Sequence, residues 1–310
     1  MTFSLGIDIG GTKIAGALVD NKGECYFRTE LPSTPNDREK MFQQVVSVIS
    51  SVLDQANYKI EDIKGIGIGV PGKVDQENGI AVFQNNLPWE NFPIVKRLRQ
   101  HFSTTICFDN DVYMAAYGEW YQLGKKQKET FVYKTISTGI SCCTIQNGEF
   151  IRGAGFAGEI GLSIVTKTTL QSKYKNNGCL EAVAAGPAIQ RMANDKLKQK
   201  FGMNGTNLTV SSTTQDVIEL YRKNDPISVE VMNEVFKHMA TGIYTITCLL
   251  DPHKLVIGGG VIDNNPDLLG FIKRDLKKIL TPEQIGILDR IYPSSLKGNA
   301  GLIGAGLRLH

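Results

Sequence analysis

A short glycine turn between two apolar runs constrains the fold of this chain more than any other feature. Residues 6–20 read GIDIGGTKIAGALVD. The pattern predicts strand, turn and strand, because Gly10 and Gly11 permit a sharp reversal and carry no side chain. Backbone amides in such a turn can hold a phosphate, and Asp8 just before it could hold a divalent cation, directly or through water. A plain hairpin, in which the glycines only turn the chain, explains the same residues.

The composition narrows the class of protein. A length of 310 residues, with 42% hydrophobic and 21% charged residues, suggests a globular protein of two domains or one large one. The net charge of +3 comes from 34 basic and 31 acidic residues without a basic stripe. Neither nucleic acid nor a membrane is therefore expected as a partner. No apolar run approaches the ~20 residues of a membrane span and no signal segment is apparent, so a cytoplasmic location and reduced cysteines are expected.

Helical and extended patterns alternate along the chain, which predicts an α/β fold. Helices are predicted at 37–57, 93–101, 112–121 and 231–250, and strands at 64–70, 105–108, 131–136, 140–145 and 254–257. Residues 73–79 are predicted to be a loop. The turn Ser137-Thr138-Gly139 between two strands echoes the opening hairpin, which suggests two related domains facing one cleft. The predicted small domain comprises 1–122 with about 298–310, and the large domain 123–297.

Two further features have more than one explanation. Asp109, Asn110 and Asp111 follow a strand and precede a helix, where open α/β sheets bind ligands, although capping of the helix explains one of the three. The glycines between Gly298 and Gly306, a segment predicted to lead into a terminal helix, suit tight packing or close approach to a base or ribose.

Common nucleotide motifs are not supported. The spacing G-x-G-x-x-G occurs at glycines 67, 69 and 72 and again at 153, 155 and 158. A dinucleotide site needs a helix to begin inside the motif, whereas Pro71 and the polar residues after it predict a loop. Gly-Gly-Thr-Lys has the wrong order for a Walker loop.

Seven segments, in order, resemble the repressor, open reading frame, kinase (ROK) family nearly from end to end. They are Gly6–Gly16, Gly67–Gly72, Asn110-Asp111, Gly158–Gly161, Gly178–Glu181, Ile257–Val261 and Gly301–Ala305. The resemblance implies an actin-like, hexokinase-type (ribonuclease H-like) fold, in which two α/β domains form a central cleft and close on ATP and a sugar. It also implies a homodimer. Because the first phosphate segment begins at residue 6, no DNA-binding helix-turn-helix is expected ahead of it.

The resemblance also implies roles for individual residues. ATP and Mg²⁺ are expected at Asp8 (reaching Mg²⁺ through water), Gly10, Gly11, Thr12, Lys13, Thr138, Gly139, Gly258, Gly259 and Gly260. The sugar is expected at Gly72, Asn86, Asn110, Asp111, Glu159 and Glu181. Asp111 would be the catalytic base for ATP-dependent phosphorylation of the 6-hydroxyl of a hexose or derivative, such as glucose, a β-glucoside or N-acetylmannosamine. An ordinary Asp, with a pKa of ~3.9, would take the proton late.

The chain departs from the family at its zinc site and its second phosphate segment. Leu162, Ser172 and Tyr174 replace a His and two cysteines, and Cys179 alone cannot form the tetrahedral site, so no zinc is expected. In the family that His also reaches the sugar near its C1 and C2 hydroxyls, so Leu162 is expected to make this end of the pocket more apolar and tolerant of a substituent. Ser141, Cys142 and Cys143 replace frequent glycines. They leave open an alternative function, a sugar-binding sensor that has lost most catalysis.

Overall fold

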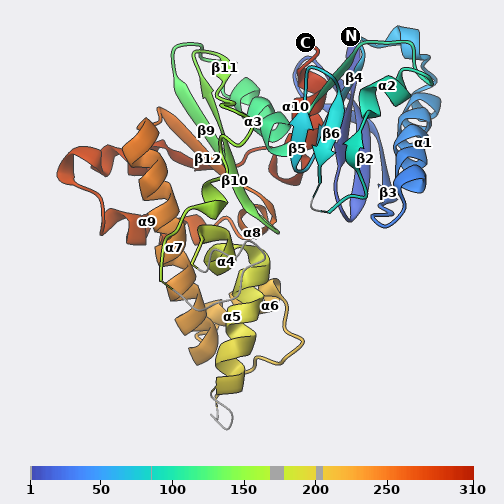
Figure 1. The fold of residues 1–310 in the computed structure, drawn as a ribbon. Coiled ribbons are helices and arrows are strands. Elements are labelled where there is room, and N and C mark those ends of the chain that lie inside the picture. Colours follow the sequence, from blue (N-terminus) through green and yellow to red (C-terminus); the bar gives the residue numbers. More distant parts are fainter. Residues whose placement is uncertain (1, 85, 168–177, 200–204) are drawn as a thin grey trace. The chain divides into compact units, whose positions relative to one another are not determined.

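The computed structural model describes residues 2–84, 86–167, 178–199 and 205–310, and Figure 1 labels its elements. The chain divides into two compact units. The first unit comprises Met1–Lys128, Cys143–Ala157 and Ser295–His310, and the second comprises Glu129–Cys142 and Gly158–Ser294. Each unit contains α-helices and β-strands, as the alternating sequence pattern predicts.

The first unit is built on a five-stranded sheet with the order β3-β2-β1-β4-β8. The strands are β1 (Phe3–Ile9), β2 (Lys13–Asp20), β3 (Cys25–Pro32), β4 (Ile66–Val70) and β8 (Ile106–Asn110). The register aligns one residue from each strand in a row across the sheet: Asp109, Gly69, Asp8, Ala15 and Glu30. Residues directly opposite each other point to the same face of a sheet. The row therefore brings three acidic side chains to one face, separated by a glycine and an alanine.

Helices cover both faces of this sheet. Helix α1 (Arg38–Ala56), with Asp37 as its N-cap, packs its apolar side on β2 and β3. Helices α3 (Asp111–Gln122) and α10 (Ala300–Leu307) pack on each other, and α10 also packs on β1, β2 and β4. A Cβ built at Gly6 or Gly67 would lie 2.2 or 1.8 Å from a backbone oxygen of α10. These glycines allow the helix to approach the sheet closely.

Gly304 and Gly306, near the C-terminus, serve the same packing. Residues 300–307 are themselves helix α10, so the expectation that residues 298–306 lead into a later helix was wrong in its boundaries. The sequence pattern did not indicate this helix, because glycine has a low helix propensity. In the folded protein, tertiary packing overrides that propensity. A Cβ built at Gly304 would lie 1.8 Å from the Met114 oxygen in α3. Tight packing, and not close approach to a base, accounts for Gly304.

A small three-stranded sheet, β5-β6-β7, also belongs to the first unit. Its strands are β5 (Lys73–Asp75), β6 (Ile80–Phe83) and β7 (Glu90–Phe92), and the short helix α2 (Ile94–Leu98) follows. The prediction of a loop over 73–79 was therefore wrong for its first three residues. Lys-Val-Asp contains no apolar run, and pairing with β6, which no local pattern reveals, makes it a strand.

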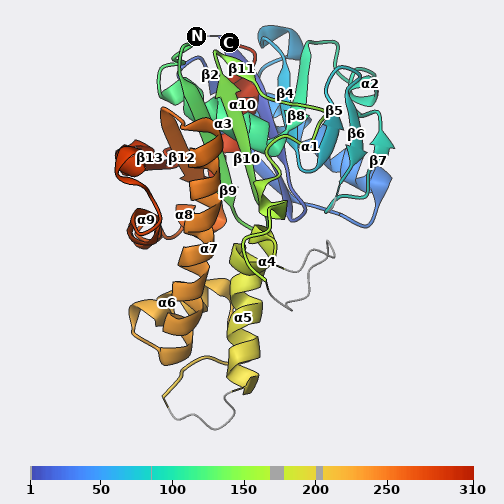
Figure 2. The ribbon, with the colours of Figure 1, turned by 60° about the vertical axis from the view of Figure 1, so that its left-hand side comes forward.

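The second sheet has the order β11-β10-β9-β12-β13, and the boundary between the units crosses β10. Its strands are β9 (Thr130–Ile136), β10 (Ile140–Gln146), β11 (Glu149–Phe150), β12 (Lys254–Gly258) and β13 (Ile291–Pro293). The helices of the second unit are α4 (Leu180–Ala184), α5 (Gly186–Gln199), α6 (Thr214–Arg222), α7 (Pro226–Leu250), α8 (Gly260–Asp263) and α9 (Leu268–Lys277). Figure 2 shows the long helix α7 beside α5, and α7 also packs on α4, α6 and α9.

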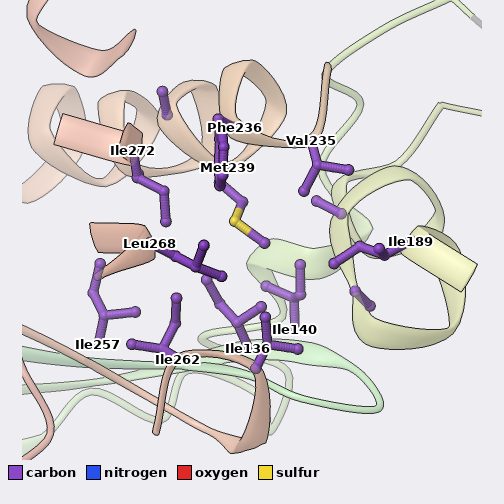
Figure 3. Close-up of a cluster of buried hydrophobic side chains, with 14 of the residues drawn as sticks. Ile136, Ile140, Ile189, Val235, Phe236, Met239, Ile257, Ile262, Leu268 and Ile272 are labelled. Atoms are coloured by element: carbon purple, nitrogen blue, oxygen red, sulfur yellow. The ribbon is translucent and has the colours of Figure 1, made fainter. Parts of the chain in front are cut away.

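Helix α7 supplies much of the hydrophobic core of the second unit. The close-up in Figure 3 shows Phe236 and Met239 of α7 facing Leu268 and side chains of the sheet. The helix ends at Leu250, as the sequence predicts, and Asp251 before Pro252 adopts a left-handed conformation. Of the helices in the described ranges, none is both long enough and apolar enough to span a lipid bilayer.

Candidate active site

Two carboxylates lie close together at one edge of the first sheet. Asp8 is near the end of β1, and Asp111 begins α3 directly after β8. The strand between them, β4, presents Gly69, whose missing side chain leaves space: a Cβ built there would lie 3.3 Å from the Asp111 Cα. Parallel strands end together at such an edge, which is where open α/β sheets bind ligands. The structure thus brings these two predicted site residues together.

Burial makes both carboxylates reluctant to ionise, and repulsion by Asp8 adds to the effect at Asp111. Both keep some solvent exposure, but burial raises the pKa of Asp8 to about 6 and the pKa of Asp111 to about 7. The charge of Asp8 is the second cause of the shift at Asp111, whereas Lys13 and Arg28 partly oppose the shift at Asp8. Carboxylate oxygens are the donors that suit a hard divalent cation such as Mg²⁺.

Asn110 caps helix α3 and also braces the loop after β4. Its Oδ1 accepts from the Val112 amide at 2.8 Å, and its Nδ2 donates to the Gly72 oxygen at 2.9 Å. The structure therefore joins two predicted sugar residues to each other, and it assigns the capping role to Asn110. Gly72 has a φ of +83°, and a Cβ there would lie 2.3 Å from the Phe83 oxygen, so the position requires glycine.

Asp109, the buried neighbour of Asn110, forms a two-pronged ion pair that sequence reasoning missed. Arg152 donates to its two carboxylate oxygens at 3.1 and 2.5 Å, and the guanidinium also lies 4.7 Å from the centre of the Tyr113 ring. Such paired contacts fix geometry as well as charge. They hold the end of β8 immediately before Asp111.

The glycine turn of the first hairpin has a defined shape. The Gly10 amide donates to the Lys13 oxygen at 2.9 Å, and Ser33 bridges the turn through its amide to Thr12 and its hydroxyl to Gly10. A Cβ built at Gly11 would lie 2.9 Å from the Asn86 Cβ. The predicted residues Gly10, Gly11, Thr12 and Lys13 are thus together, with Asn86 against them. Ser33 carries no motif that would have identified it.

In the second unit, Glu181 braces the second glycine turn. It accepts from the Ile140 amide at 2.9 Å, and a Cβ at Gly139 would lie 2.6 Å from the same carboxylate oxygen. Glu159 is exposed, and its neighbour Gly158 is bonded to the strand that follows this turn: the Gly158 oxygen accepts from the Cys142 amide at 2.8 Å. Thr138, Gly139, Glu159 and Glu181 are therefore neighbouring parts of one unit.

A pocket of about 260 Å³ lies wholly within the second unit. It joins two predicted nucleotide residues, Thr138 and Gly260, to polar residues that sequence reasoning missed: Gln190, Thr214, Gln215, Asn264 and Asn265. Gly258 and Gly259 pack on β9, and a Cβ at Gly259 would lie 2.4 Å from the Thr135 hydroxyl oxygen. These two glycines thus support the segment that carries Gly260 to the pocket wall.

The departures at the family's zinc positions are only partly covered by the structure. Ser172 and Tyr174 lie outside the described residues. Leu162 closes a single 3₁₀ turn, Ile160–Leu162, and Cys179 is fully buried. Across the described ranges, no group of three or more His, Cys, Asp or Glu side chains is arranged to hold a metal ion. The expected lack of zinc stays a prediction.

Comparison with known proteins identifies the family. The family model described as "ROK family" matches residues 4–309. The glucokinase of Halalkalibacterium halodurans is 27% identical over 97% of this chain and 93% of its own length, and the N-acetyl-D-glucosamine kinase of Haemophilus influenzae is 26% identical over 89% and 88%. A ROK family glucokinase from Streptomyces griseus, solved with glucose and AMPPNP, superimposes with a TM-score of 0.82 at 25% identity, covering 98% of this chain and 97% of that one. The expected actin-like, hexokinase-type fold is confirmed, and the chain belongs to the ROK family.

Proposed function

We propose that this protein is an ATP-dependent sugar kinase that phosphorylates the primary 6-hydroxyl of a hexose or hexose derivative. The observation that carries the proposal is the pair formed by Asp8 and Asp111 beside the Gly10–Lys13 turn. Two carboxylates that resist joint ionisation suit a base and a cation ligand acting on one phosphoryl group. The named activities of the glucokinase and N-acetyl-D-glucosamine kinase relatives support the same reaction class.

In the proposed reaction, the sugar 6-oxygen attacks the γ-phosphorus of ATP as the bond to the ADP oxygen breaks. Asp111 orients the hydroxyl and takes its proton. Its pKa of about 7 makes it a stronger base than an ordinary Asp, yet one that accepts the proton only as charge develops. Asp8 would hold Mg²⁺ through water, and the bound ion would neutralise phosphate charge.

The other predicted residues take binding roles. The turn amides and Lys13 would hold phosphate in the first unit, and Thr138 with Gly139 would do so in the second. The polar pocket beside Gly260 would take the adenosine. Asn86, Glu159 and Glu181 would contact sugar hydroxyls, whereas Gly72 and Asn110, which bond to each other, would shape the sugar site.

Leu162 bears on which sugar is used. We propose that its apolar side chain admits a substituent at C1 or C2, as in a β-glucoside or an N-acetylhexosamine. Competition assays test this directly. If free glucose were preferred by orders of magnitude over every C1- or C2-substituted sugar, the idea would be refuted.

An ADP-release assay tests the proposed function across glucose, fructose, mannose, N-acetylmannosamine, N-acetylglucosamine and cellobiose. We expect turnover with at least one sugar, abolished by Asp111→Asn while sugar binding persists. A wild-type protein that binds a sugar tightly but releases no ADP with any of them would instead favour the alternative, a sugar-binding sensor of the same fold.

The proposal extends to assembly and metal content. We propose a homodimer without zinc and with no nucleic-acid partner. Light scattering on the purified protein and elemental analysis for zinc test the first two, and retention on immobilised DNA tests the third.

A further inference from the structure

The edge strand of the first sheet contains a bulge close to the candidate phosphate turn. The pairing of β2 with β3 shifts between two pairs, Gly16 with Thr29 and Leu18 with Tyr26. One residue of β2, Ala17, therefore faces two of β3, Phe27 and Arg28. Phe27 has a φ of +53° and is 45% exposed. An aromatic residue in the left-handed region is costly, and bulges redirect the side chains beside them.

The bulge directs Arg28 to the sheet face that carries Asp8. Glu30 shares the row of Asp8 and Ala15, and Arg28, two residues before Glu30, points to the same face. Arg28 Nε donates to Glu30 at 3.1 Å, and its Nη1 donates to the side chain of Asn299, directly before α10. The same helix start abuts Asp8, since a Cβ built at Gly301 would lie 3.3 Å from the Asp8 carboxylate.

Two cations beside this turn share one carboxylate oxygen. Lys13 Nζ donates to Glu30 Oε1 at 2.9 Å, so two cations, Lys13 and Arg28, bind the same oxygen of a single carboxylate. The side chains of Arg28 and Lys13 are 35% and 55% exposed. Ion pairs this exposed contribute little to stability. Their stabilising effect alone therefore does not explain why a strained aromatic residue, Phe27, is kept beside them. Two exposed cations that share one oxygen next to a glycine turn instead suit an anion, which would give each of them a further partner.

We propose that Arg28 is a further phosphate-binding residue, which acts with Lys13 on the terminal phosphates of a nucleotide held at the Gly10–Gly11 turn. A guanidinium can pair two donors with two phosphate oxygens, and a lysine adds a point charge. The inference rests on the proposed function, because it takes the nucleotide to be ATP. It adds a role for β3, from which no motif residue comes.

Calorimetric titration with ATP, ADP and AMP, in EDTA and without sugar, tests this role independently of turnover. Arg28→Met is expected to weaken ATP binding about 10- to 100-fold, the range of a charged hydrogen bond, and to leave AMP binding unchanged. Arg28→Lys should recover part of the loss. Arg290→Met is the matched control, since Arg290 is 32% exposed and pairs with one carboxylate at 2.8 Å. In steady-state assays, Arg28→Met should raise the KM for ATP and not that for the sugar.

Glu30→Gln separates binding from a structural role. It breaks the same ion pair but keeps both cations, so ATP affinity should stay within about threefold of wild type. Equal weakening by Glu30→Gln and Arg28→Met, or equal loss of AMP and ATP binding in Arg28→Met, would refute the inference. Unchanged ATP binding in Arg28→Met, with an active wild type, refutes only the inference. A wild type that binds no ATP refutes the proposed function as well.

Discussion

A buried lysine in the second unit is expected to destabilise the protein at neutral pH. Lys134, on β9, has no solvent exposure, and among the described residues its Nζ has no hydrogen-bond partner. Space for it comes from Gly242 of α7, where a Cβ would lie 3.0 Å from Nζ. An unpaired buried cation is unfavourable, so replacing it with Met, an apolar residue of similar length, should stabilise the fold.

The magnitude follows from the pKa. Burial lowers the pKa of Lys134 from 10.5 to about 8, despite an opposing effect of Cys142. The difference of about 2.5 units, at ~1.36 kcal/mol per unit, corresponds to about 3 kcal/mol. Below pH 8, both the folded and the unfolded states are protonated and the full penalty applies. Between pH 8 and 10.5 the unfolded state binds more protons, so the free energy of unfolding rises with pH in the wild type.

Urea unfolding at intervals from pH 6.5 to 10 measures this effect. Lys134→Met should exceed the wild type by about 3 kcal/mol near pH 7, and the difference should shrink steadily above pH 8. Lys237→Met, at an exposed position on α7, is the control and should show no such trend. A variant less stable than wild type at pH 7, or a difference independent of pH, would refute the reasoning.

Three further predictions concern the first unit. Asp8→Ala should lower kcat at least about 100-fold, because Asp8 is proposed to act through Mg²⁺. Sugar affinity, measured by fluorescence titration, should change little. Equal losses of kcat and of sugar affinity would contradict this prediction. The new methyl group of Gly304→Ala would overlap α3, so the free energy of unfolding, measured by thermal unfolding, should fall by about 1–3 kcal/mol or more. Gly298→Ala is the control and should leave stability unchanged, because a Cβ there meets nothing within 4 Å. Arg152→Met should lower the free energy of unfolding by about 3 kcal/mol or more, because it leaves the buried Asp109 without its ion-pair partner. Adding Asp109→Asn should recover part of that loss. If Arg152→Met alone left stability unchanged, the ion pair would be dispensable.

Local patterns were enough to find the residues that follow strand ends. Asp8 was identifiable because it interrupts an apolar run, and Asp111 because it follows a predicted strand and precedes a predicted helix. The long helix α7 was identifiable because its apolar period is sustained. Their closeness depends on Gly69, whose importance comes from the register of β4 between two other strands. That register is a property of three segments packed together, and no single segment encodes it.

The missed features share a dependence on distant partners. Phe27 carries no signal for a left-handed conformation, so the bulge that redirects Arg28 was not predictable. Asp109 meets Arg152 from a segment 43 residues later. Gln215 and Asn265 line one pocket from elements 50 residues apart. Sequence reasoning thus found the parts of the candidate site that resemble a motif, and missed the residues that support them.

The position of α10 in the chain has a consequence for synthesis. The sheet face it covers carries Gly6 and Gly67, yet the helix ends at Leu307, 240 residues after Gly67. At ~5–20 residues per second, the ribosome needs ~12–48 s to make that stretch. Helix α1 can pack on the opposite face early, whereas Ala15, Ala17 and Val19 stay exposed until α10 has been made. The nascent first unit should therefore need protection from aggregation until the final helix emerges, and the edge bearing Asp8 should be completed last.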